Sequence, residues 1–278
     1  GMLVNGIPSF RIGKDVVKSE IDVLREMGVE FKCGVEVGKD VTIEQLRAQG
    51  YKGFYVAIGA QKSAKLRVPG EELEGVYGGV DFLRKVNLGK KPRIGKKCAV
   101  IGGGNVAMDA ARCAKRLGAE NVYIVYRRGM AELPARKEEV EHAEEEGIIF
   151  KTLCNPVEIL PDEDGFVKAI TCIEMELGEP DASGRRRPIE KKGSEFTMDV
   201  DTVIMSLGTS PNPLIRSTTP GLETNKHGCI VTEGDEGKTS REGVYAGGDA
   251  VTGAATVIKA MGAGKAAAKA IDEYIRNK

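Results

Sequence analysis

The sequence has no excess of either charge, because its 41 Lys and Arg residues balance 41 Asp and Glu residues. Nucleic acids and anionic membranes attract basic surfaces, so this balance argues against either as the main partner. The chain also lacks an uninterrupted run of about 18 apolar residues, the length that a membrane-spanning helix needs. We therefore expect no membrane span.

The N-terminus lacks the basic stretch and long apolar core of a secretion signal, so we expect a cytoplasmic protein. Gly1 before Met2 is typical of the residue left after removal of a tag, and we expect the natural chain to begin further upstream.

The cysteines lack close pairing, since no two have a C-x-x-C or similar spacing. This excludes a thioredoxin-type redox pair and the usual local zinc or iron–sulfur site. We expect reduced core thiols in a reducing compartment. The two histidines, His142 and His227, are expected to face solvent. The six cysteines are Cys33, Cys98, Cys113, Cys154, Cys172 and Cys229.

Apolar spacing predicts a helix over residues 15–27, and Val29 to Phe31 read as the start of a strand. Thr42 or Asp40 can cap a short helix over residues 43–49. A buried strand that ends in a glycine turn is expected at residues 53–59. The basic, Gly-rich residues 89–97 are the best linker.

A strand–helix–strand unit follows, with strands at 98–101 and 122–126 and a helix at about 104–117. Residues 135–146 predict a charged helix. Alternating polarity over residues 150–205 predicts an antiparallel excursion with a polar hairpin tip at 179–194. Strand-to-glycine turns are expected at 202–208 and 243–248, and an Ala-rich helix at about 254–276.

The first chemical motif is a G-x-G-x-x-A loop, Gly102 to Ala107, between a predicted strand and a predicted helix. Gly102 permits the tight turn, Gly104 lets a pyrophosphate approach the backbone, and Ala107 allows close packing of the helix on the strand. The free N–H groups at the helix N-terminus would hold the phosphates. The alternative is a tight turn without a ligand, but the context on both sides favours dinucleotide binding.

The second predicted strand ends in Arg127-Arg128, where an NAD site would carry an acid for the ribose 2′-hydroxyl. Guanidinium groups suit a 2′-phosphate, because they form paired hydrogen bonds to it. The pattern therefore favours NADP over NAD, with Arg136 as a possible helper. A solvated pair of charges at a strand end is the alternative.

Near the C-terminus, a strand delivers Gly247-Gly248-Asp249 to a further helix. Such an aspartate can accept hydrogen bonds from the ribityl hydroxyls of a flavin. The positive end of the helix, near Thr256-Val257, would stabilise the charge of the reduced flavin. An aspartate that only caps a helix is the alternative.

With these motifs in place, the chain resembles the FAD- and NADPH-binding part of the glutamate synthase small subunit and its relatives. These include the flavin region of dihydropyrimidine dehydrogenase and the large subunit of ferredoxin:NADP transhydrogenase. The resemblance covers nearly the whole chain, in the family's order. The matching stretches are residues 6–11, 57–60, 102–109, 126–128, 132–135, 206–208, 243–249 and 256–257. One departure is Ile58, where relatives usually carry Thr.

The resemblance implies residue roles. For FAD, it implies contacts from Arg11, Val37, Gly248, Asp249, Thr256 and Val257. For NADP, it implies contacts from Gly102, Gly103, Gly104, Asn105, Val106, Arg127, Arg128, Ser206, Leu207 and Gly208. It implies an α/β flavoprotein architecture of two dinucleotide-binding domains, with a Rossmann-like NADP domain inserted in a truncated FAD domain. We expect residues 1–90 and 211–278 to belong to the FAD-binding domain and residues 91–210 to form the NADP-binding domain.

The resemblance further implies an NADPH-dependent FAD oxidoreductase without a catalytic side chain, because hydride passes directly between two stacked rings. Relatives begin with an iron–sulfur domain and a first dinucleotide-binding unit, neither of which is present in this sequence. Electrons would leave through such iron–sulfur centres or a partner subunit. The alternative is a module that binds NADP(H) without turnover. A thioredoxin-reductase-like enzyme is excluded by the missing C-x-x-C.

Overall fold

The computed structural model describes residues 1–180, 182 and 184–278, and the chain forms two compact units. The first unit comprises residues 1–20 and 63–208, and the second comprises residues 21–62 and 209–278. The segment predicted as a linker, residues 89–97, connects two elements of the first unit instead. The predicted division at residues 90 and 210 stays a prediction.

The first unit is built on a five-stranded parallel sheet. Its apolar residues alternate between the two faces, and both faces are buried, as parallel sheets require. Because all five strands run the same way, their carboxyl ends meet at one edge. The strands, in spatial order, are β3 (Val76–Gly78), β11 (Thr202–Met205), β4 (Lys97–Ile101), β5 (Asn121–Tyr126) and β6 (Ile149–Thr152).

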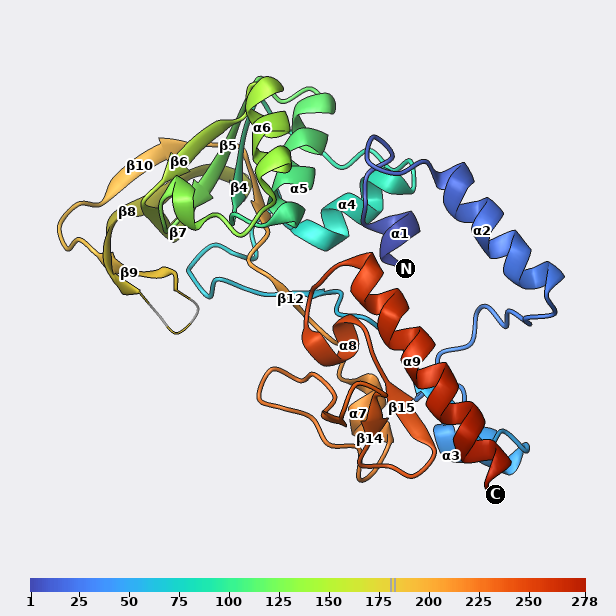
Figure 1. Ribbon diagram of the computed structural model, residues 1–278. Coiled ribbons are helices and arrows are strands. Elements are labelled where there is room, and N and C mark those ends of the chain that lie inside the picture. Colours follow the sequence, from blue (N-terminus) through green and yellow to red (C-terminus); the bar gives the residue numbers. More distant parts are fainter. Residues whose placement is uncertain (181, 183) are drawn as a thin grey trace. The chain divides into compact units, whose positions relative to one another are not determined.

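Three helices cover one face of this sheet (Figure 1). Cys98, Val100 and Ile124 point toward them and are fully buried. Small residues of α5 allow that helix to lie close to the sheet, and Ala107 is fully buried as expected. Gly118, with φ of +110°, follows the helix and lets the chain turn. The helices are α4 (Gly79–Asn87), α5 (Asn105–Arg116) and α6 (Lys137–Glu145).

An antiparallel sheet covers the opposite face, where Ala99, Ile101 and Val125 meet its buried side chains. The predicted excursion over residues 150–205 is thereby confirmed. The predicted tip at 179–194 was too long, because β9 packs onto β8 through Ile189; residues 181 and 183 of that tip lie outside the described residues. The strands are β7 (Cys154–Pro161), β8 (Val167–Pro180), β9 (Arg186–Glu190) and β10 (Phe196–Asp199).

The N-terminal segment of the first unit contains α1 (Met2–Asn5) and the start of α2 (Lys14–Glu26). The helix predicted at 15–27 is confirmed by α2. The strand predicted from Val29 was wrong: residues 29–31 are described, and they form no strand. Val29 and Phe31 are exposed, because no neighbouring strand of the described chain pairs with them.

The second unit contains a four-stranded sheet in which β1 and β15 are parallel. Thr42, rather than Asp40, caps α3, in a reciprocal capping box with Gln45. A short helix, α8, precedes α9, which starts at Val257 rather than at about 254. The strands are β1 (Phe54–Val56), β15 (Val244–Ala246), β14 (Lys238–Thr239) and β13 (Thr232–Glu233). The helices are α3 (Ile43–Ala48), α7 (Leu214–Thr218), α8 (Asp249–Thr252) and α9 (Val257–Arg276).

The remaining elements are short. A 3-10 helix, η1 (Met130–Glu132), follows β5, and β2 (Lys62–Ser63) pairs with β12 (Thr209–Ser210) where the chain passes from one unit to the other. Among the residues described, no helix is long and apolar enough to cross a membrane.

Candidate dinucleotide site

The Gly-rich loop lies at the carboxyl edge of the parallel sheet, where β4 passes into α5. Gly102 has φ of +136°, and a Cβ there would lie 2.2 Å from the carbonyl oxygen of Ser206. A Cβ on Gly103 would lie 2.7 Å from Leu133 and 2.8 Å from Tyr126. Only glycine therefore fits these two positions.

Gly104 differs from its two neighbours, because a Cβ there would meet no atom of the described chain within 4 Å. It is the N-cap of α5, and no described side chain caps that helix. The first N–H groups of α5 are consequently available to an anion, and the helix dipole favours negative charge at this end. The open space at Gly104 agrees with the predicted approach of a pyrophosphate.

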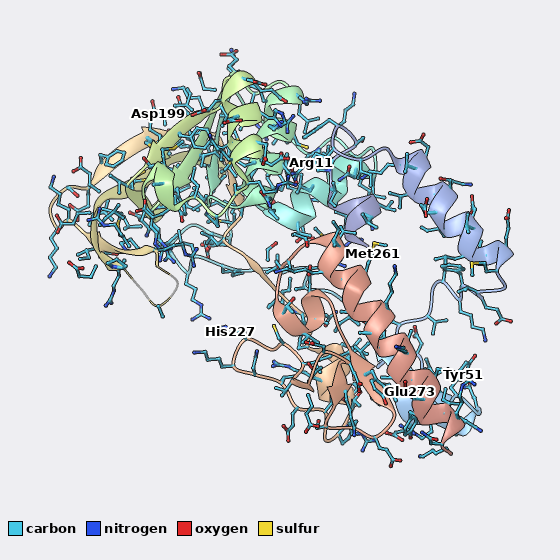
Figure 2. The ribbon with its side chains drawn as sticks, viewed as in Figure 1. Arg11, Tyr51, Asp199, His227, Met261 and Glu273 are labelled. Carbon is cyan, nitrogen blue, oxygen red and sulfur yellow. The ribbon has the colours of Figure 1, made fainter. Side chains whose placement is uncertain are left out.

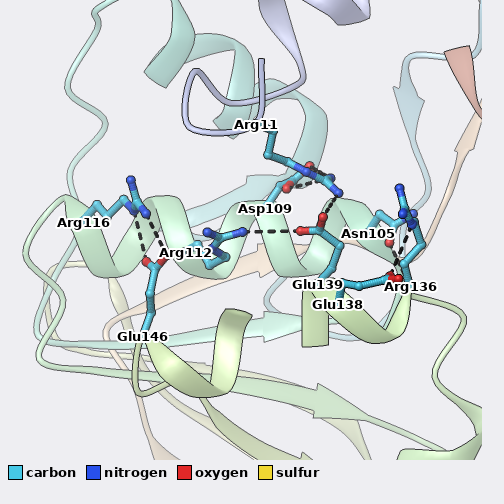
Figure 3. A network of polar contacts seen from close by, with 9 residues as sticks. All are labelled: Arg11, Asn105, Asp109, Arg112, Arg116, Arg136, Glu138, Glu139 and Glu146. Carbon is cyan, nitrogen blue, oxygen red and sulfur yellow. Dashed lines mark hydrogen bonds and ion pairs between the residues drawn. The ribbon is translucent and has the colours of Figure 1, made fainter. Parts of the chain in front are cut away.

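The segment after β5 folds back onto the glycine loop through backbone hydrogen bonds. The Ala135 N–H donates to the Gly103 carbonyl at 3.1 Å. The Arg136 N–H donates to the Asn105 side-chain oxygen at 2.9 Å, a pair seen in Figure 3. The Asn105 side chain thus holds the loop that carries the predicted arginines. Its predicted contact with NADP stays a prediction.

The three predicted 2′-phosphate residues have different surroundings. Arg127 is exposed at the end of β5. Arg128 is only 9% exposed, and its Nε donates to the Arg186 carbonyl at 2.8 Å. The Arg136 side chain is 65% exposed and lies 3.6 Å from Glu138. The structure therefore brings Arg127 to the site edge with its guanidinium in solvent and holds Arg128 inside the fold.

The predicted contacts at residues 206–208 lie at the same edge. The Ser206 N–H donates to the Ile101 carbonyl at 2.8 Å, which brings its backbone against Gly102. The Ser206 Oγ is buried and has no hydrogen-bond partner in the described chain. Leu207 is 38% exposed, and Gly208 has φ of +130°. The Ser206 Oγ lies beside Gly79 at the start of α4, where a Cβ would be 2.5 Å from it.

Arg11, predicted to contact FAD, lies against α5 and α6 of the first unit (Figure 3). Its Nη1 donates to both Asp109 carboxylate oxygens, at 3.0 and 3.1 Å, and its Nη2 pairs with Glu139. Phe10 lies beneath the Arg112 and Arg116 guanidinium groups, 4.3 and 4.2 Å from its ring centre. The predicted contact of Arg11 with FAD stays a prediction.

This ion-pair network extends along α5. Arg112 pairs with Glu139 at 3.4 Å and with Glu146 at 2.8 Å. Burial raises the pKa of Asp109 to about 6, although the Arg11 guanidinium opposes that rise. The Arg116 hydrogen bond lowers the pKa of Glu146. Sequence reasoning missed this network; acids and arginines on a helix face otherwise made of alanines were the available signal, because buried charges need partners.

In the second unit, the predicted flavin residues gather at the turn between β15 and α9. Gly248 has φ of +64°, and Asp249 begins α8. The Asp249 carboxylate accepts the Ala255 N–H at 3.0 Å, and the Thr256 hydroxyl accepts the Lys259 N–H at 3.4 Å as the cap of α9. Val257 is 36% exposed.

Three further groups of predicted residues remain. Val37 is half-buried and packs against the core of the second unit. His142 and His227 are exposed, as expected; Figure 2 labels His227 on its loop. All six cysteines are free thiols, and the Cys154 thiol donates to the Lys151 carbonyl at 3.2 Å.

Comparison with known proteins identifies close relatives of the chain. It is 43% identical over 280 residues to the NADP(+)-dependent formate dehydrogenase subunit beta of Moorella thermoacetica, covering 99% of this chain and 39% of that protein. It is 34% identical over 289 residues to the glutamate synthase [NADPH] small chain of Escherichia coli, covering 99% of this chain and 61% of that one. The chain thus spans 39% and 61% of the length of these curated relatives.

The fold has a solved counterpart in Mycobacterium tuberculosis FprA in complex with NADPH. The TM-score is 0.81 at 21% identity, and the match covers 100% of this chain and 75% of that chain. This likeness confirms the predicted α/β fold class. The relatives confirm the resemblance to the glutamate synthase small subunit. Residues 15–264 match the family model described as pyridine nucleotide-disulphide oxidoreductase, and the chain belongs to this family.

Proposed function

We propose that the chain is the nucleotide- and flavin-binding part of an NADPH-dependent FAD oxidoreductase of the glutamate synthase small-subunit type. The observation that carries the proposal is the edge of the parallel sheet in the first unit. There, the uncapped N-terminus of α5 follows Gly104, and the exposed Arg127 directly follows the neighbouring strand β5. The relatives' names, which include NADPH or NADP(+), support it.

The residues of this edge fit an NADP(H) molecule. The amides at the start of α5 would bind the pyrophosphate, with room at Gly104 for its approach. Arg127 would bind the 2′-phosphate. Ser206, whose backbone lies against Gly102, would lie beside the same ligand. Arg136 and the predicted contacts at Gly103, Asn105, Val106, Leu207 and Gly208 remain part of this proposal.

The second unit fits one end of a flavin. Asp249, held by the Ala255 amide, would accept hydrogen bonds from ribityl hydroxyls, and the positive end of α9 would stabilise negative charge on the ring. Bound NADPH would supply a hydride and bound FAD would accept it. The chain's residues would orient the two ligands and exclude water, without moving a proton. Val37, Gly248, Thr256, Val257 and Arg11 remain proposed FAD contacts.

Electrons would leave to iron–sulfur centres or to a partner subunit. Support comes from the names of the relatives, a subunit beta and a small chain. The family alternative is a subunit of the ferredoxin:NADP transhydrogenase type. The predicted cytoplasmic location and the absence of a nucleic-acid partner belong to the same proposal.

The test is a calorimetric titration of the purified protein with NADPH, followed by NADPH-driven reduction of a dye with FAD supplied. We expect NADPH to bind and dye reduction to require FAD. Absence of NADPH binding would contradict the proposal. Binding without any flavin-dependent turnover would favour a second function, an NADP(H)-binding module, because the sequence contains only the second of the family's two glycine loops.

A further inference from the structure

We propose that Arg127 and Arg128 have separate tasks: Arg127 alone binds the 2′-phosphate, and Arg128 is a positioning residue that docks the β8–β9 hairpin beside the site. The inference rests on the proposed function, since it requires that the site take NADP(H). It departs from the sequence expectation that both arginines bind the phosphate.

The two side chains differ in exposure and in partners. Arg127 is exposed, and its guanidinium has no hydrogen bond or ion pair within the described residues. Arg128 is 9% exposed, and its Nε donates to the Arg186 carbonyl of β9 at 2.8 Å. An Arg that commits Nε to a carbonyl loses its side-on pair of N–H groups for a phosphate, and the low exposure of Arg128 limits the access of a ligand to its remaining Nη groups. Arg127 keeps every donor.

Arg128 lies where three segments meet. Its carbonyl accepts the Leu153 N–H at 3.0 Å, and the Leu153 carbonyl accepts the Met175 N–H of β8 at 2.8 Å. Leu153 has φ of +55°, a left-handed conformation that is strained for a leucine. The backbone of Arg128 is therefore joined to the β6–β7 connection, while its side chain is joined to β9.

On the side of the hairpin, further hydrogen bonds join Arg186 of β9 to β8. The Arg186 guanidinium donates to the Leu177 carbonyl at 2.9 Å and to the Gly178 carbonyl at 3.2 Å, both on β8. Leu177 also approaches the loop after the arginines, since a Cβ on Gly129 would lie 3.7 Å from its Cδ1. The hairpin is thus a support for the loop that bears Arg127.

From that loop the contacts continue to the phosphate-binding backbone. The loop is bonded to the glycine loop through Ala135 and Gly103, and through Arg136 and Asn105. Loss of the Arg128 hydrogen bond should therefore make the arginine loop and the glycine loop less rigid. The binding of every dinucleotide should weaken, whether or not it has a 2′-phosphate. Substitution of Arg127 should weaken the binding of only the nucleotide that has this phosphate.

Glutamine provides a matched pair of variants. The Gln Nε2 is separated from Cα by the same bonds as the Arg Nε, so Arg128→Gln keeps an N–H donor for the Arg186 carbonyl and removes the charge. Arg127→Gln removes the charge at the neighbouring position. Calorimetric titration of each variant with NADPH and with NADH separates loss of charge from loss of position.

We expect Arg127→Gln to weaken the binding of NADPH about 10- to 100-fold and to change the binding of NADH little, since one to two charge-assisted contacts are lost. Arg128→Gln should keep the NADPH-to-NADH affinity ratio within about threefold of the unsubstituted protein. A loss of that ratio in Arg128→Gln as large as in Arg127→Gln would overturn the inference.

Arg128→Ala removes the donor as well, and mass-spectrometric hydrogen exchange follows its effect on β9. We expect faster exchange of the amides at residues 186–190 and a similar weakening of both nucleotides, with both effects reversed in Arg128→Gln. Unchanged exchange in Arg128→Ala would overturn the docking role, and the glutamine pair tests the inference even if this variant fails to fold. If the unsubstituted protein does not bind NADPH, the proposed function fails and the inference with it, whereas a failure in the variants alone leaves the function standing.

Discussion

The two units of the chain differ in how completely each forms its own core. All of the largest fully buried side chains, including Phe82, Met108 and Ile124, belong to the first unit. In the second unit the strands have two or three residues, and large apolar side chains stay exposed. Ile258 and Met261 on α9 are 81% and 58% exposed, and Met261 is labelled in Figure 2.

The same contrast applies to the two proposed ligand sites. The first unit contains the glycine loop, the uncapped helix and the arginine-bearing strand at one edge of one sheet. The second unit contributes a turn, an aspartate and a helix, with no glycine loop in its sequence for a second pyrophosphate. A ligand site whose parts share one buried sheet is formed by that unit alone.

The largest expected effect concerns flavin retention. Without a second phosphate loop, we predict that the 278-residue chain purifies with little FAD, since losing about 4 kcal/mol of contacts lowers affinity roughly a thousandfold. Absorbance of the purified protein in the flavin range checks this. Stoichiometric FAD would contradict the difference between the two units, because it would mean that the second unit binds FAD as completely as the first unit is proposed to bind NADP(H).

The next effect concerns Arg11, which joins the N-terminal segment to the first unit. Arg11→Ala would leave the buried carboxylates of Asp109 and Glu139 without their main cation, so we expect a loss of about 2–4 kcal/mol in the free energy of unfolding. Urea denaturation followed by circular dichroism measures it, since the chain has no Trp.

Arg116→Ala serves as the matched control for Arg11→Ala. Arg116 is 50% exposed, and its partner Glu146 keeps Arg112, so this loss should stay below about 1 kcal/mol. Equal effects of the two substitutions would mean that the N-terminal segment is no part of the first unit's core.

A pair of glycine substitutions distinguishes an effect on the stability of the first unit from an effect on its NADPH binding. Gly102→Ala forces a Cβ to 2.2 Å from a carbonyl oxygen at φ of +136°, and we expect it to lower the free energy of unfolding by about 1–3 kcal/mol. Gly104→Ala, at φ of −91° with open space, should stay within about 1 kcal/mol yet weaken NADPH binding. Urea denaturation measures the stability of both variants, and calorimetry measures their affinity for NADPH. An unchanged NADPH affinity in Gly104→Ala would contradict binding of the pyrophosphate at this loop.

The smallest expected effect is a pH dependence. The pKa of Asp109 is about 6 in the fold against an ordinary 3.8, so folded Asp109 retains a proton that the unfolded chain has lost between these values. Stability from this group is therefore greatest below the lower value and falls as the pH rises through the window.

Asp109→Asn isolates this group, because Glu146 and the other acids of the network remain in both proteins. Urea denaturation from about pH 4 to about pH 6.5 should show the unsubstituted protein losing stability relative to the variant. A relative gain with rising pH would show that Arg11 and Arg112 outweigh burial, and that the pKa of Asp109 is lowered.

The sequence predicted the first unit well because its patterns are local. A strand, a glycine loop and a helix in series place Gly102 and Gly104 at the right points before any tertiary contact is known. Thr42 could be named as a cap for the same reason. Val29 to Phe31 were misread because an apolar stretch becomes a strand only when a neighbour pairs with it.

The features that escaped prediction depend on contacts between distant residues. Arg11 meets Asp109 across 98 positions, and Arg128 meets Arg186 across 58. Neighbouring arginines look equivalent in a sequence, and only the fold shows that one is buried by a hairpin.

The central claim is that the first unit carries a complete NADP(H) site without help from a bound flavin. Calorimetric titration of the flavin-free protein with NADPH and with NADH tests it most directly. We expect NADPH to bind at least about tenfold more tightly than NADH, since one charge-assisted contact to the 2′-phosphate is worth that much. Equal affinities for the two nucleotides, or NADPH binding only after FAD is added, would contradict it.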